Sequence, residues 1–304
     1  MPGGPAGNTI GEELSKGVLM AAGPFLVLGA TGGQGGAVVS ALLDRSLPVR
    51  GLVRDTSAPA AKRLAERGAE VVAGSLDDAE SLAAAMGGAS GAFGLTTPFE
   101  AGPDAEIEQG RAIAAAAQRA ELPHLVFSSV AAADQRTGVP HFDSKAVVEH
   151  ELAAADVPRT VLGPTYFFDN ALGGLDRIRE GVLDLPLPPN LPLQQLARRD
   201  LGEFAAEVLL NPEPHLGHRI ELASDEPTPT QMAAALSAVL GTPVRHEQPL
   251  VEHIENPDMQ AMWRFLNGPG YRVDLSALHA SHPQVRWTSF AQWAATAIGG
   301  PGLF

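Results

Sequence analysis

Two stretches of this 304-residue chain contain residues whose types and spacing could do chemistry. The first is "GATGGQGG" (residues 29–36), where Gly29, Gly32 and Gly35 recur at every third position behind the apolar run "FLVL". A glycine turn between a strand and a helix lets the backbone approach a diphosphate, whose charge the helix N-terminus stabilises. The second is "HFDSK" (residues 141–145), where His141 and Lys145 stand four positions apart and would share one face of a helix. The two stretches predict a phosphate-binding turn and a pair of groups suited to proton transfer.

The glycine spacing alone also fits a turn that binds no ligand. It reads G-x-x-G-x-x-G, which differs from the G-x-G-x-x-G of long-chain dehydrogenases. The context favours a dinucleotide site, because an apolar strand pattern precedes the turn and the helical pattern "GAVVSALLDRS" follows it. In that setting Gly29 permits the tight turn, Gly32 permits close approach to a pyrophosphate, and Gly35 permits close packing of the helix on the strand.

The end of the second predicted strand indicates which dinucleotide would bind. It reads "GLVRDTSAPAAKR", with Arg54 at the strand end, Asp55 next to it and Lys62 further along. An arginine here suits the 2′-phosphate of NADP, whereas an acidic residue suits the ribose hydroxyls of NAD. Arg54 and Lys62 therefore favour NADP(H), and Asp55 leaves NAD(H) possible. A solvated strand-end charge is the alternative interpretation of Arg54.

Short apolar runs that alternate with helical patterns must position these residues. Strands are expected at residues 25–29, 49–54, 70–73, 92–96, 125–128 and 160–162. Helices are expected between them at residues 35–46, 58–67, 78–86, 104–121 and 143–155. Such alternation is typical of right-handed βαβ units. The pattern predicts an α/β protein with a Rossmann-type doubly wound parallel sheet.

The pattern changes after residue 164, where the Pro-rich stretch "LDLPLPPNLPLQ" (residues 183–194) excludes a helix. We expect residues 23–164 to form the NAD(P)-binding domain, with residues 199–224 returning to its sheet. Residues 165–198 and 225–304 are expected to form a smaller α/β substrate-side lobe, with helices at residues 228–241 and 288–299. Residues 1–22 have the composition of a flexible leader. The apolar "MWRFLNG" (residues 262–268) could serve a pocket wall or a dimer.

Composition and charge exclude several classes of site and partner. The chain has no cysteine, which excludes a disulfide framework, a zinc–thiolate site and a cysteine nucleophile, and its nine histidines lack metal-ligand spacing. A formal net charge of −14 disfavours direct binding to nucleic acid. No apolar run predicts a membrane span, and cleavage of residues 17–30 as a signal peptide would destroy the glycine turn. We therefore expect a cytoplasmic protein without a metal ion, as a monomer or homodimer.

Five motifs in order along the chain carry a family resemblance. They are "GATGGQGG", "LVRD", "GAEVVAGSLDD", "HFDSKAVVE" and "PTYFFDN". Together they resemble the NmrA-like family of atypical short-chain dehydrogenases/reductases over roughly residues 24–300. "HFDSK" with its following glutamate is similar to the NADP(H)-binding redox-sensor branch of that family. The resemblance implies a Rossmann fold that binds NADP(H).

The resemblance also implies which residues would bind each part of the cofactor. The pyrophosphate would lie on the glycine turn, made of Gly29, Ala30, Thr31, Gly32, Gly33, Gln34 and Gly35. The 2′-phosphate would contact Arg54 and Lys62, and the adenine would lie beside Ser75 and Leu76. The nicotinamide end would be enclosed by Thr97, Pro98, Phe99, Lys145 and, from residues 165–170, Tyr166, Phe167 and Asn170. There are alternative interpretations: Leu76 and Phe99 could simply pack at the ends of their strands, and Ser75 could be a turn residue.

The same resemblance raises the question of catalysis. Short-chain reductases protonate their substrate with a tyrosine. A lysine four positions after this tyrosine lowers its pKa. This chain has Lys145 but carries His141 in place of the tyrosine, which departs from the pattern for carbonyl reduction. His141 could deliver the proton itself, since an ordinary histidine pKa near 6.5 suits neutral pH. Alternatively, it could be a polar residue at the helix start with no catalytic role. Ser128 or Ser129 would orient the substrate, and both also fit a turn.

Two functions follow as hypotheses. The first is an NAD(P)H-dependent oxidoreductase of quinone or carbonyl type that acts on a small-molecule substrate, since reduction of a quinone can take its protons from water. The second is a non-catalytic NADPH/NADP redox sensor that acts through a regulatory protein partner, because His141 replaces the tyrosine. A DNA-binding regulator is disfavoured by the negative charge.

Overall fold

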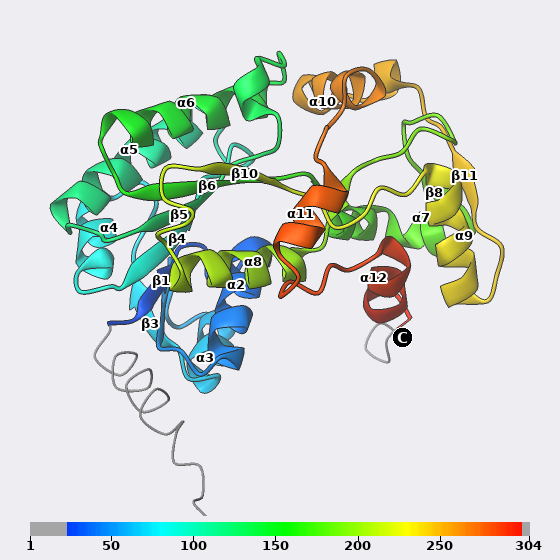
Figure 1. Cartoon of the computed structure of the whole chain (residues 1–304). Coiled ribbons are helices and arrows are strands. Elements are labelled where there is room, and N and C mark those ends of the chain that lie inside the picture. The colour runs from blue at the N-terminus through cyan, green and yellow to red at the C-terminus, as the bar shows by residue number, and fades with distance from the viewer. Residues whose placement is uncertain (1–22, 300–304) are drawn as a thin grey trace, which may run out of the picture.

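A seven-stranded parallel sheet forms the centre of the computed structural model, which describes residues 23–299. The strands lie in the order β10-β6-β5-β4-β1-β2-β3, and all neighbouring pairs are parallel. Their bounds are β1 (Phe25–Val27), β2 (Val49–Val53), β3 (Glu70–Ala73), β4 (Gly91–Leu95), β5 (Leu125–Ser128), β6 (Arg159–Pro164) and β10 (Arg219–Leu222). From β1 the chain builds the sheet in one direction to β3 and then in the other from β4 (Figure 1). This doubly wound architecture confirms the predicted Rossmann-type α/β fold.

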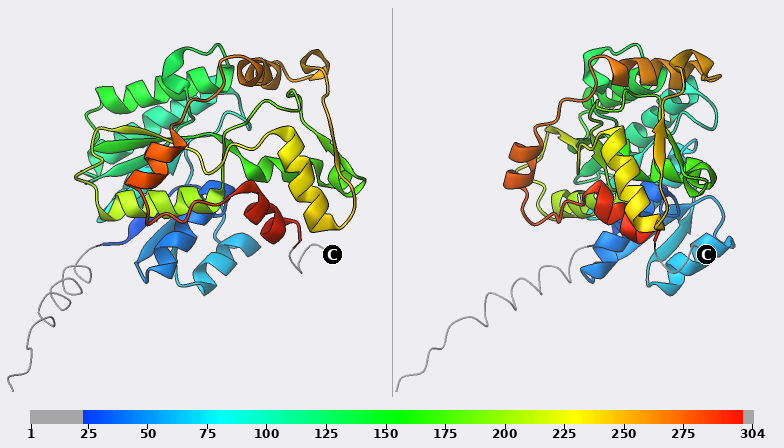
Figure 2. Two further views of the ribbon diagram at one scale, coloured as in Figure 1. Left: turned by 45° about the vertical axis from the view of Figure 1, so that its right-hand side comes forward. Right: turned by 90° about the vertical axis from the view of Figure 1, so that its right-hand side faces the viewer.

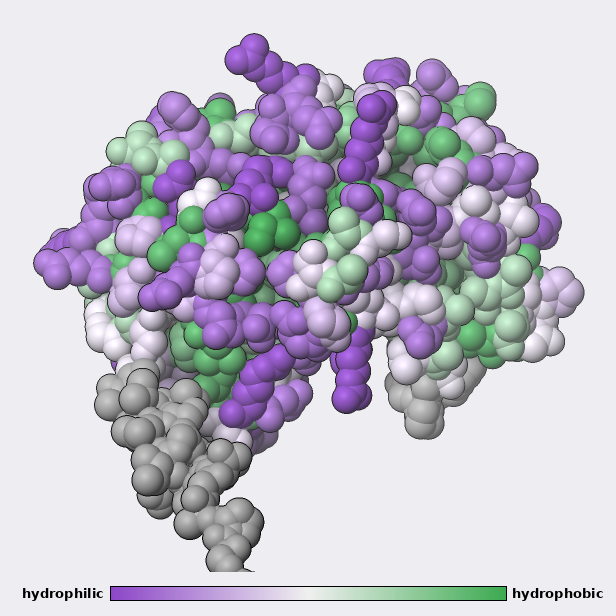
Figure 3. Space-filling model, in the orientation of Figure 1, coloured by the Kyte–Doolittle hydropathy of each residue, from purple (hydrophilic) through white to green (hydrophobic). Residues whose placement is uncertain are grey.

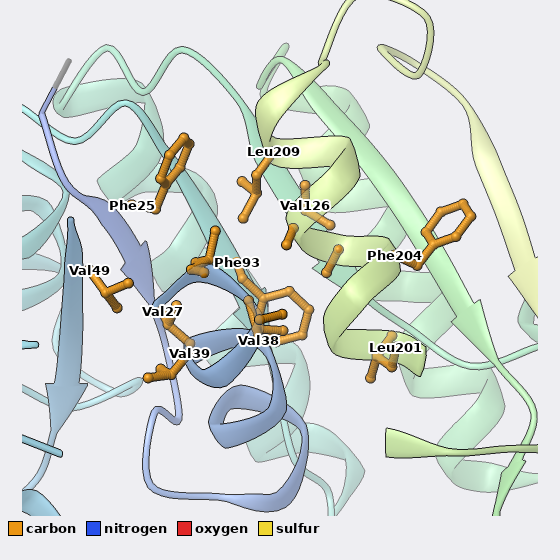
Figure 4. Close-up of a cluster of buried hydrophobic side chains, with 14 of the residues drawn as sticks. Phe25, Val27, Val38, Val39, Val49, Phe93, Val126, Leu201, Phe204 and Leu209 are labelled. Atoms are coloured by element: carbon orange, nitrogen blue, oxygen red, sulfur yellow. The ribbon is translucent and has the colours of Figure 1, made fainter. Parts of the chain in front are cut away.

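Helices cover both faces of the sheet (Figures 1 and 2). One face is covered by α4 (Ala79–Met86), α5 (Pro103–Arg119) and α6 (Pro140–Ala154), and the other by α2 (Gly33–Asp44), α3 (Pro59–Glu66) and α8 (Arg198–Leu210). Because both faces are covered, the central strands β1, β4 and β5 are largely apolar on both sides, and every residue of β1 is buried. Figure 4 shows the hydrophobic cluster between the sheet, α2 and α8, which includes Phe93, Val38 and Leu201.

Small residues let pairs of helices approach each other closely. A Cβ atom on Gly202 of α8 would stand 2.5 Å from the carbonyl oxygen of Ala37 in α2. A Cβ atom on Gly110 of α5 would stand 2.6 Å from Cγ1 of Val148 in α6. Both distances are below van der Waals contact, so each pair of helices depends on its glycine. The contact of α8 with α2 places Arg198, the first residue of α8, beside the N-terminus of α2.

The chain leaves the sheet after β6 and returns to it at β10, which pairs with β6. The remaining segments have a hydrophobic cluster of their own, in which Phe168, Phe290 and Trp293 pack on one another. Two small parallel sheets, β7–β9 and β8–β11, belong to this region. The predicted boundaries between domain and lobe remain predictions, and the predicted leader, residues 1–22, lies outside the described residues.

The elements of this second region are mostly short. They are β7 (Tyr166–Phe167), α7 (Leu175–Arg179), β8 (Val182–Asp184), β9 (Gln195–Leu196), α9 (Pro229–Leu240), β11 (Arg245–Glu247), α10 (Pro257–Asn267), α11 (Leu275–Ser281) and α12 (Phe290–Ala297). Short 3-10 helices lie at Ala133–Gln135, Phe168–Gly174 and Val251–His253. The sequence pattern predicted α9 and α12 but not α7, α10, α11 or the four short strands.

Hydrophilic side chains predominate on the face shown in Figure 3, and hydrophobic ones stand in small groups. Within residues 23–299, no helix combines the length and the hydropathy needed to cross a membrane. Phe99 is 69% exposed, which is unusual for a large hydrophobic side chain. It follows the carboxyl end of β4, the edge at which open α/β sheets bind their ligands.

Candidate functional site

The strand order reverses between β1 and β4, and open α/β sheets bind ligands outside the carboxyl ends of the strands at such a point. Two cavities lie there, one of about 530 Å³ and one of about 230 Å³. Gly29, Gly32 and Leu95 line both of them. The glycine turn after β1 therefore stands between the two cavities, where one elongated ligand could contact both.

The backbone of the turn follows from its glycines. Gly29 has a φ of +60°, in the left-handed region that favours glycine. A Cβ atom on Gly35 would stand 2.2 Å from the carbonyl oxygen of Gly29, so α2 packs against the turn as the spacing predicts. The Gly32 N–H donates to that carbonyl at 2.8 Å, and Gly32 caps α2 without a side-chain hydrogen bond. The first N–H groups of α2 thus remain available to an anion in the larger cavity, which Gly33 and Gln34 also line.

An exposed ion pair borders the smaller cavity. Nη1 of Arg54 lies 3.0 Å from Oε2 of Glu100, and both side chains are more than half exposed. Exposed pairs contribute little to stability, so Arg54 can exchange Glu100 for another anion. In the same cavity, the Gln109 side chain accepts a hydrogen bond from the Thr97 N–H at 3.1 Å and donates one to Asp77 at 3.2 Å.

The carboxylate of Asp55 is engaged in a local turn. Its Oδ1 accepts hydrogen bonds from the hydroxyl of Ser57 at 2.7 Å and from the N–H of Ser57 at 2.8 Å. These hydrogen bonds lower the pKa of Asp55. Asp55 lines neither cavity, whereas Arg54 lines the smaller one. Of the two residues at this strand end, Arg54 is the one placed to meet a ligand.

Aromatic and methionine side chains form a large part of the wall of the larger cavity. They are Phe99, Phe142, Tyr166, Phe167, Met259, Met262, Trp263 and Tyr271. Tyr166 packs on Trp263 with ring centroids 5.5 Å apart, and Tyr271 stacks on Phe142 at 6.1 Å. Burial raises the pKa of Tyr166 to about 12 and also raises the pKa of Tyr271, so both phenols stay neutral. The cavity suits a flat, uncharged molecule.

His141 is one of the polar groups in this wall, and it has a carboxylate partner. Its Nδ1 lies 2.5 Å from Oδ1 of Asp258, at the start of α10. The imidazole packs edge-on against Phe142 at 4.7 Å and lies 5.7 Å from the ring of Phe99. The "HFDSK" pattern indicated His141 but not Asp258, which is 117 positions further along the chain.

Arg198 brings a positive charge to the glycine turn. A Cβ atom on Gly33 would stand 2.5 Å from Nη1 of Arg198, so the guanidinium lies over the start of α2. Oδ1 of Asp169 lies 3.6 Å from the same nitrogen, and the ring centre of Phe167 lies 5.9 Å from the guanidinium carbon. Local sequence gave no sign of this placement, because it depends on how α8 packs against α2.

A model of the NmrA-like family matches residues 23–291. The chain belongs to the NmrA-like family. Its relatives include the NAD(P)H azoreductase of Xenophilus azovorans, which is 31% identical over 224 residues that cover 73% of this chain and 76% of that protein.

Solved structures of other proteins share the fold of this NmrA-like chain. The NADPH-dependent quinone oxidoreductase QOR2 of Escherichia coli, complexed with NADPH, has a TM-score of 0.77 and 23% identity, over 90% of this chain and 99% of that one. NmrA, a negative transcriptional regulator in complex with NADP, has a TM-score of 0.75 and 20% identity, over 90% and 95% of the two chains. At these identities the likeness establishes the fold.

Lys145 of this NmrA-like chain lies in a buried ion pair. Its Nζ lies 2.9 Å from Oε1 of Glu106 and donates to the carbonyl oxygen of Thr96 at 2.6 Å. The buried Glu106 also accepts from the hydroxyls of Thr96 at 2.9 Å and Ser144 at 2.5 Å. Burial lowers the pKa of Lys145, against the opposite effect of Glu106. Lys145 lines neither cavity, so the predicted contact with a nicotinamide ribose would require it to leave this pair.

Ser128 and Ser129 end β5 with different partners. The Ser128 hydroxyl donates to the Gln34 side chain at 2.7 Å, which ties β5 to the glycine turn. The Ser129 hydroxyl donates to Glu149, whose other oxygen lies 3.1 Å from Nε of Arg219. Ser129 lines the larger cavity and Ser128 lines neither, so Ser129 is the serine placed to meet a ligand.

Most of the predicted site residues meet at the two cavities. The larger cavity is lined by Gly29, Gly32, Gly33, Gln34, Gly35, Phe99, His141, Tyr166, Phe167 and Asn170. The smaller cavity is lined by Gly29, Thr31, Gly32, Arg54, Ser75, Leu76 and Thr97. The predicted residues that line neither cavity are Ala30, Lys62, Pro98, Ser128 and Lys145. Ala30 is buried beside Gly51 of β2, and Lys62 is exposed on α3.

The sequence carried one unused signal for α10, which supplies Asp258, Met262 and Trp263 to the site. Asn256 precedes Pro257, and its side chain accepts hydrogen bonds from the N–H groups of Asp258 at 2.9 Å and Met259 at 3.3 Å. An asparagine cap followed by proline is typical of a helix start. The signal predicts the helix but not that Asp258 would meet His141.

Replacing Glu106 with glutamine should destabilise the protein, because it leaves the Lys145 ammonium buried without its carboxylate. We expect the free energy of unfolding to fall by about 3–5 kcal/mol, as for loss of one partner of a buried ion pair. The double variant Glu106→Gln, Lys145→Met also removes the ammonium and should recover much of that loss. Urea unfolding of the wild type, both single variants and the double variant measures the coupling. A Glu106→Gln protein as stable as the wild type would contradict this description of the pair.

Proposed function

We propose that this NmrA-like protein is an NADPH-dependent reductase that acts on a flat aromatic acceptor of the quinone or azo type. The observation that carries the proposal is the pair of cavities that meet at the glycine turn. Arg54 borders the smaller cavity, and aromatic side chains line the larger one. NADPH is divided in the same way, with a phosphorylated adenosine at one end, a diphosphate in the middle and a flat nicotinamide at the other end.

The residues of the turn fit the diphosphate of this cofactor. Gly32 and Gly33 have no side chain where the diphosphate would lie, and α2 begins with free N–H groups. The guanidinium of Arg198 adds a cation at the same place. The bound cofactor would supply the hydride, while these residues hold its phosphates. The Escherichia coli quinone oxidoreductase that shares this fold was solved with NADPH, which supports the proposal.

Arg54 favours NADPH over NADH. A guanidinium recognises a phosphate through paired hydrogen bonds, and the exposed Glu100 is a weak competitor for it. The alternative, in which Asp55 binds the ribose hydroxyls of NADH, would require its carboxylate to leave Ser57.

The larger cavity favours a flat, uncharged acceptor. Its aromatic wall includes the paired rings of Tyr166 and Trp263, and both of its phenols stay neutral. Offset stacking on such rings stabilises flat conjugated molecules. One relative is named an NAD(P)H azoreductase and one structural neighbour an NADPH-dependent quinone oxidoreductase, which supports azo and quinone acceptors.

His141 is the proposed proton donor. Hydride transfer brings two electrons and one hydrogen to the acceptor, and one proton must follow to the quinone oxygen or the azo nitrogen. His141 lines the cavity that would hold the acceptor, and a histidine can donate a proton near neutral pH. Lys145 is paired with Glu106 and does not line this cavity, so the proton is assigned to His141 alone.

The second candidate function is a redox sensor that binds NADPH or NADP and acts through a protein partner with little or no turnover. The observation that favours it is the buried ion pair of Lys145 with Glu106. With Lys145 engaged there and His141 in place of the tyrosine, neither catalytic residue of a short-chain reductase is in its usual role. A structural neighbour that is a transcriptional regulator in complex with NADP supports this alternative.

Oxidation of NADPH in the presence of acceptors distinguishes the two functions. We expect the wild-type protein to oxidise NADPH with 2-methyl-1,4-naphthoquinone or an aromatic azo dye, because both can stack in the larger cavity, and to act poorly on small aliphatic aldehydes. The absorbance of NADPH reports the rate. A rate no greater than the protein-free background with every acceptor would rule out the reductase and leave the sensor.

Replacing Arg54 with alanine should weaken NADPH binding by about 10-fold while NADH binding stays the same, because only NADPH carries the 2′-phosphate. Calorimetric titration of both dinucleotides measures this. Glu100→Gln is the matched control: it removes the competing carboxylate and should leave NADPH binding equal or tighter. If Arg54→Ala changes neither affinity, the 2′-phosphate does not lie at Arg54.

Replacing Arg198 with alanine should weaken NADPH and NADH alike, by about 10-fold, because the diphosphate is common to both. Arg199→Ala is the control, since Arg199 lines neither cavity and instead contacts the carbonyl oxygen of Arg286 at 3.3 Å. Calorimetry with both dinucleotides reports the affinities. Equal losses in the two variants would show a general effect of charge rather than a contact with the diphosphate.

A further inference from the structure

On the basis of the reductase function proposed above, we infer that Asp258 positions His141 as the proton donor to the acceptor, so that the two side chains act as a pair. The carboxylate of Asp258 lies 2.5 Å from Nδ1 of His141 and 3.4 Å from the backbone nitrogen of the same residue. The side chains are 10% exposed for His141 and 21% exposed for Asp258. Such a shielded pair interacts more strongly than one in water.

The identity of the partner determines which nitrogen of the imidazole is left for a ligand. A carboxylate only accepts hydrogen bonds, so Nδ1 carries the hydrogen and donates it to Asp258. Within residues 23–299, the side-chain hydrogen bond of His141 is the one from Nδ1, and Nε2 forms none. Nε2 is therefore the nitrogen that can hold an acidic proton for a molecule in the larger cavity. Asp258 fixes the orientation of the ring and stabilises the imidazolium, as carboxylates do for other catalytic histidines.

The same helix shapes the place where the acceptor would lie. From its first two turns α10 contributes Asp258, Met259, Met262 and Trp263 to the site. It lies near the N-terminal end of α6, which carries His141 (Figures 1 and 2). The helix that orients the proton donor therefore also forms a wall for the acceptor. One segment of the C-terminal half would set both the position of the acceptor and the direction of the proton.

Other charged or titratable groups around His141 are engaged elsewhere or neutral. The ion pairs are Lys145–Glu106 beside α6, Arg54–Glu100 in the loop of Phe99, and Arg198–Asp169 across the larger cavity. The phenols of Tyr166 and Tyr271 stay neutral because burial raises the pKa of both. Asp143, in the first turn of α6, has no hydrogen bond or ion pair with His141. The carboxylate that contacts the imidazole is thus that of Asp258.

The reaction balances with this pair. The acceptor receives a hydride from the nicotinamide, which brings two electrons, and a proton from Nε2 of the imidazolium. In a quinone the hydride reaches one oxygen and this proton reaches the other, which gives the hydroquinone. In an azo group they reach the two nitrogens, which gives the hydrazine. The imidazole left behind is neutral, keeps its Nδ1–H bond to Asp258 and regains the Nε2 proton from water.

A purely structural role for Asp258 makes different predictions. Its carboxylate also lies at the N-terminus of α6, where an anion stabilises a helix through the free N–H groups. If Asp258 served only this purpose, its loss would lower stability and activity without changing the state of the imidazole. The tests below therefore report on the ring and on the pH dependence of the rate.

The first test is nitrogen NMR of the cofactor-free protein with isotopically labelled histidine. We expect neutral His141 in the wild type to carry its hydrogen on Nδ1, and Asp258→Ala to shift it toward Nε2. Asp258→Glu should keep the hydrogen on Nδ1, and Asp143→Ala, the matched control, should change nothing. A wild-type His141 that carries its hydrogen on Nε2 overturns the pairing whether or not the variants fold.

The second test is the pH dependence of kcat for reduction of 2-methyl-1,4-naphthoquinone by NADPH. We expect the wild-type rate to fall on the alkaline side as the donor loses its proton, and His141→Gln to remove this dependence with a loss of roughly 100-fold. Asp258→Ala should lower kcat, because the imidazole then loses the carboxylate that orients it toward the acceptor. Asp258→Glu should restore much of kcat, and Asp143→Ala should leave kcat unchanged.

The outcomes distinguish a failure of the His141–Asp258 pairing from a failure of the proposed reductase function. If Asp258→Ala lowers kcat but leaves the hydrogen of the imidazole on Nδ1, and Asp258→Glu does not restore kcat, Asp258 is a structural residue and the inference is overturned. If the wild type oxidises no NADPH with any acceptor while the NMR signature of the pair is present, the reductase function and the donor role fail together, and only the pairing stands.

Discussion

The carbonyl oxygen of Gly29 and the backbone of Gly35 lie so close together that a Cβ atom on residue 35 would stand 2.2 Å from that oxygen. This close contact between Gly29 and Gly35 places the start of α2 against the turn that follows β1. On the other side, a Cβ atom on Gly29 would stand 3.3 Å from Cδ2 of Leu95, at the end of β4. The turn is therefore held between a helix and a strand, and it separates the two cavities that any ligand of this edge would occupy.

Contacts between segments far apart in the chain complete the site. Gly202 lets α8 pack against α2, and this brings the guanidinium of Arg198 over Gly33. The N-terminal end of α10 meets that of α6, and this brings Asp258 to His141. The glycine turn is in this way combined with a cation, a histidine–aspartate pair and an aromatic wall.

Features set by neighbouring residues could be predicted from the sequence. Each βα unit has its own apolar run and helical pattern, so the doubly wound sheet followed from their alternation. The glycine turn and Arg54 directly follow strands, and parallel topology brings such strand ends to one edge. The engagement of Asp55 with Ser57 was also within reach, since an aspartate two residues before a serine favours a local turn.

Features set by packing between distant helices could not be predicted. Lys145 stands in an ordinary helical pattern, and nothing around it indicates that Glu106 of α5 would reach it inside the protein. Arg198 and Asp258 are charged residues at helix starts, where solvated side chains are common. Ala30 lies within the glycine turn, yet its side chain points into the core beside Gly51 rather than toward a ligand.

The central claim is that one dinucleotide spans both cavities across the glycine turn, and a crystal structure of the protein with bound NADPH tests it most directly. We expect the 2′-phosphate at Arg54, the diphosphate against residues 29–34 and Arg198, and the nicotinamide in the aromatic cavity that His141 lines. Density for the nicotinamide outside that cavity, or for a cofactor that does not cross the turn, would contradict the claim.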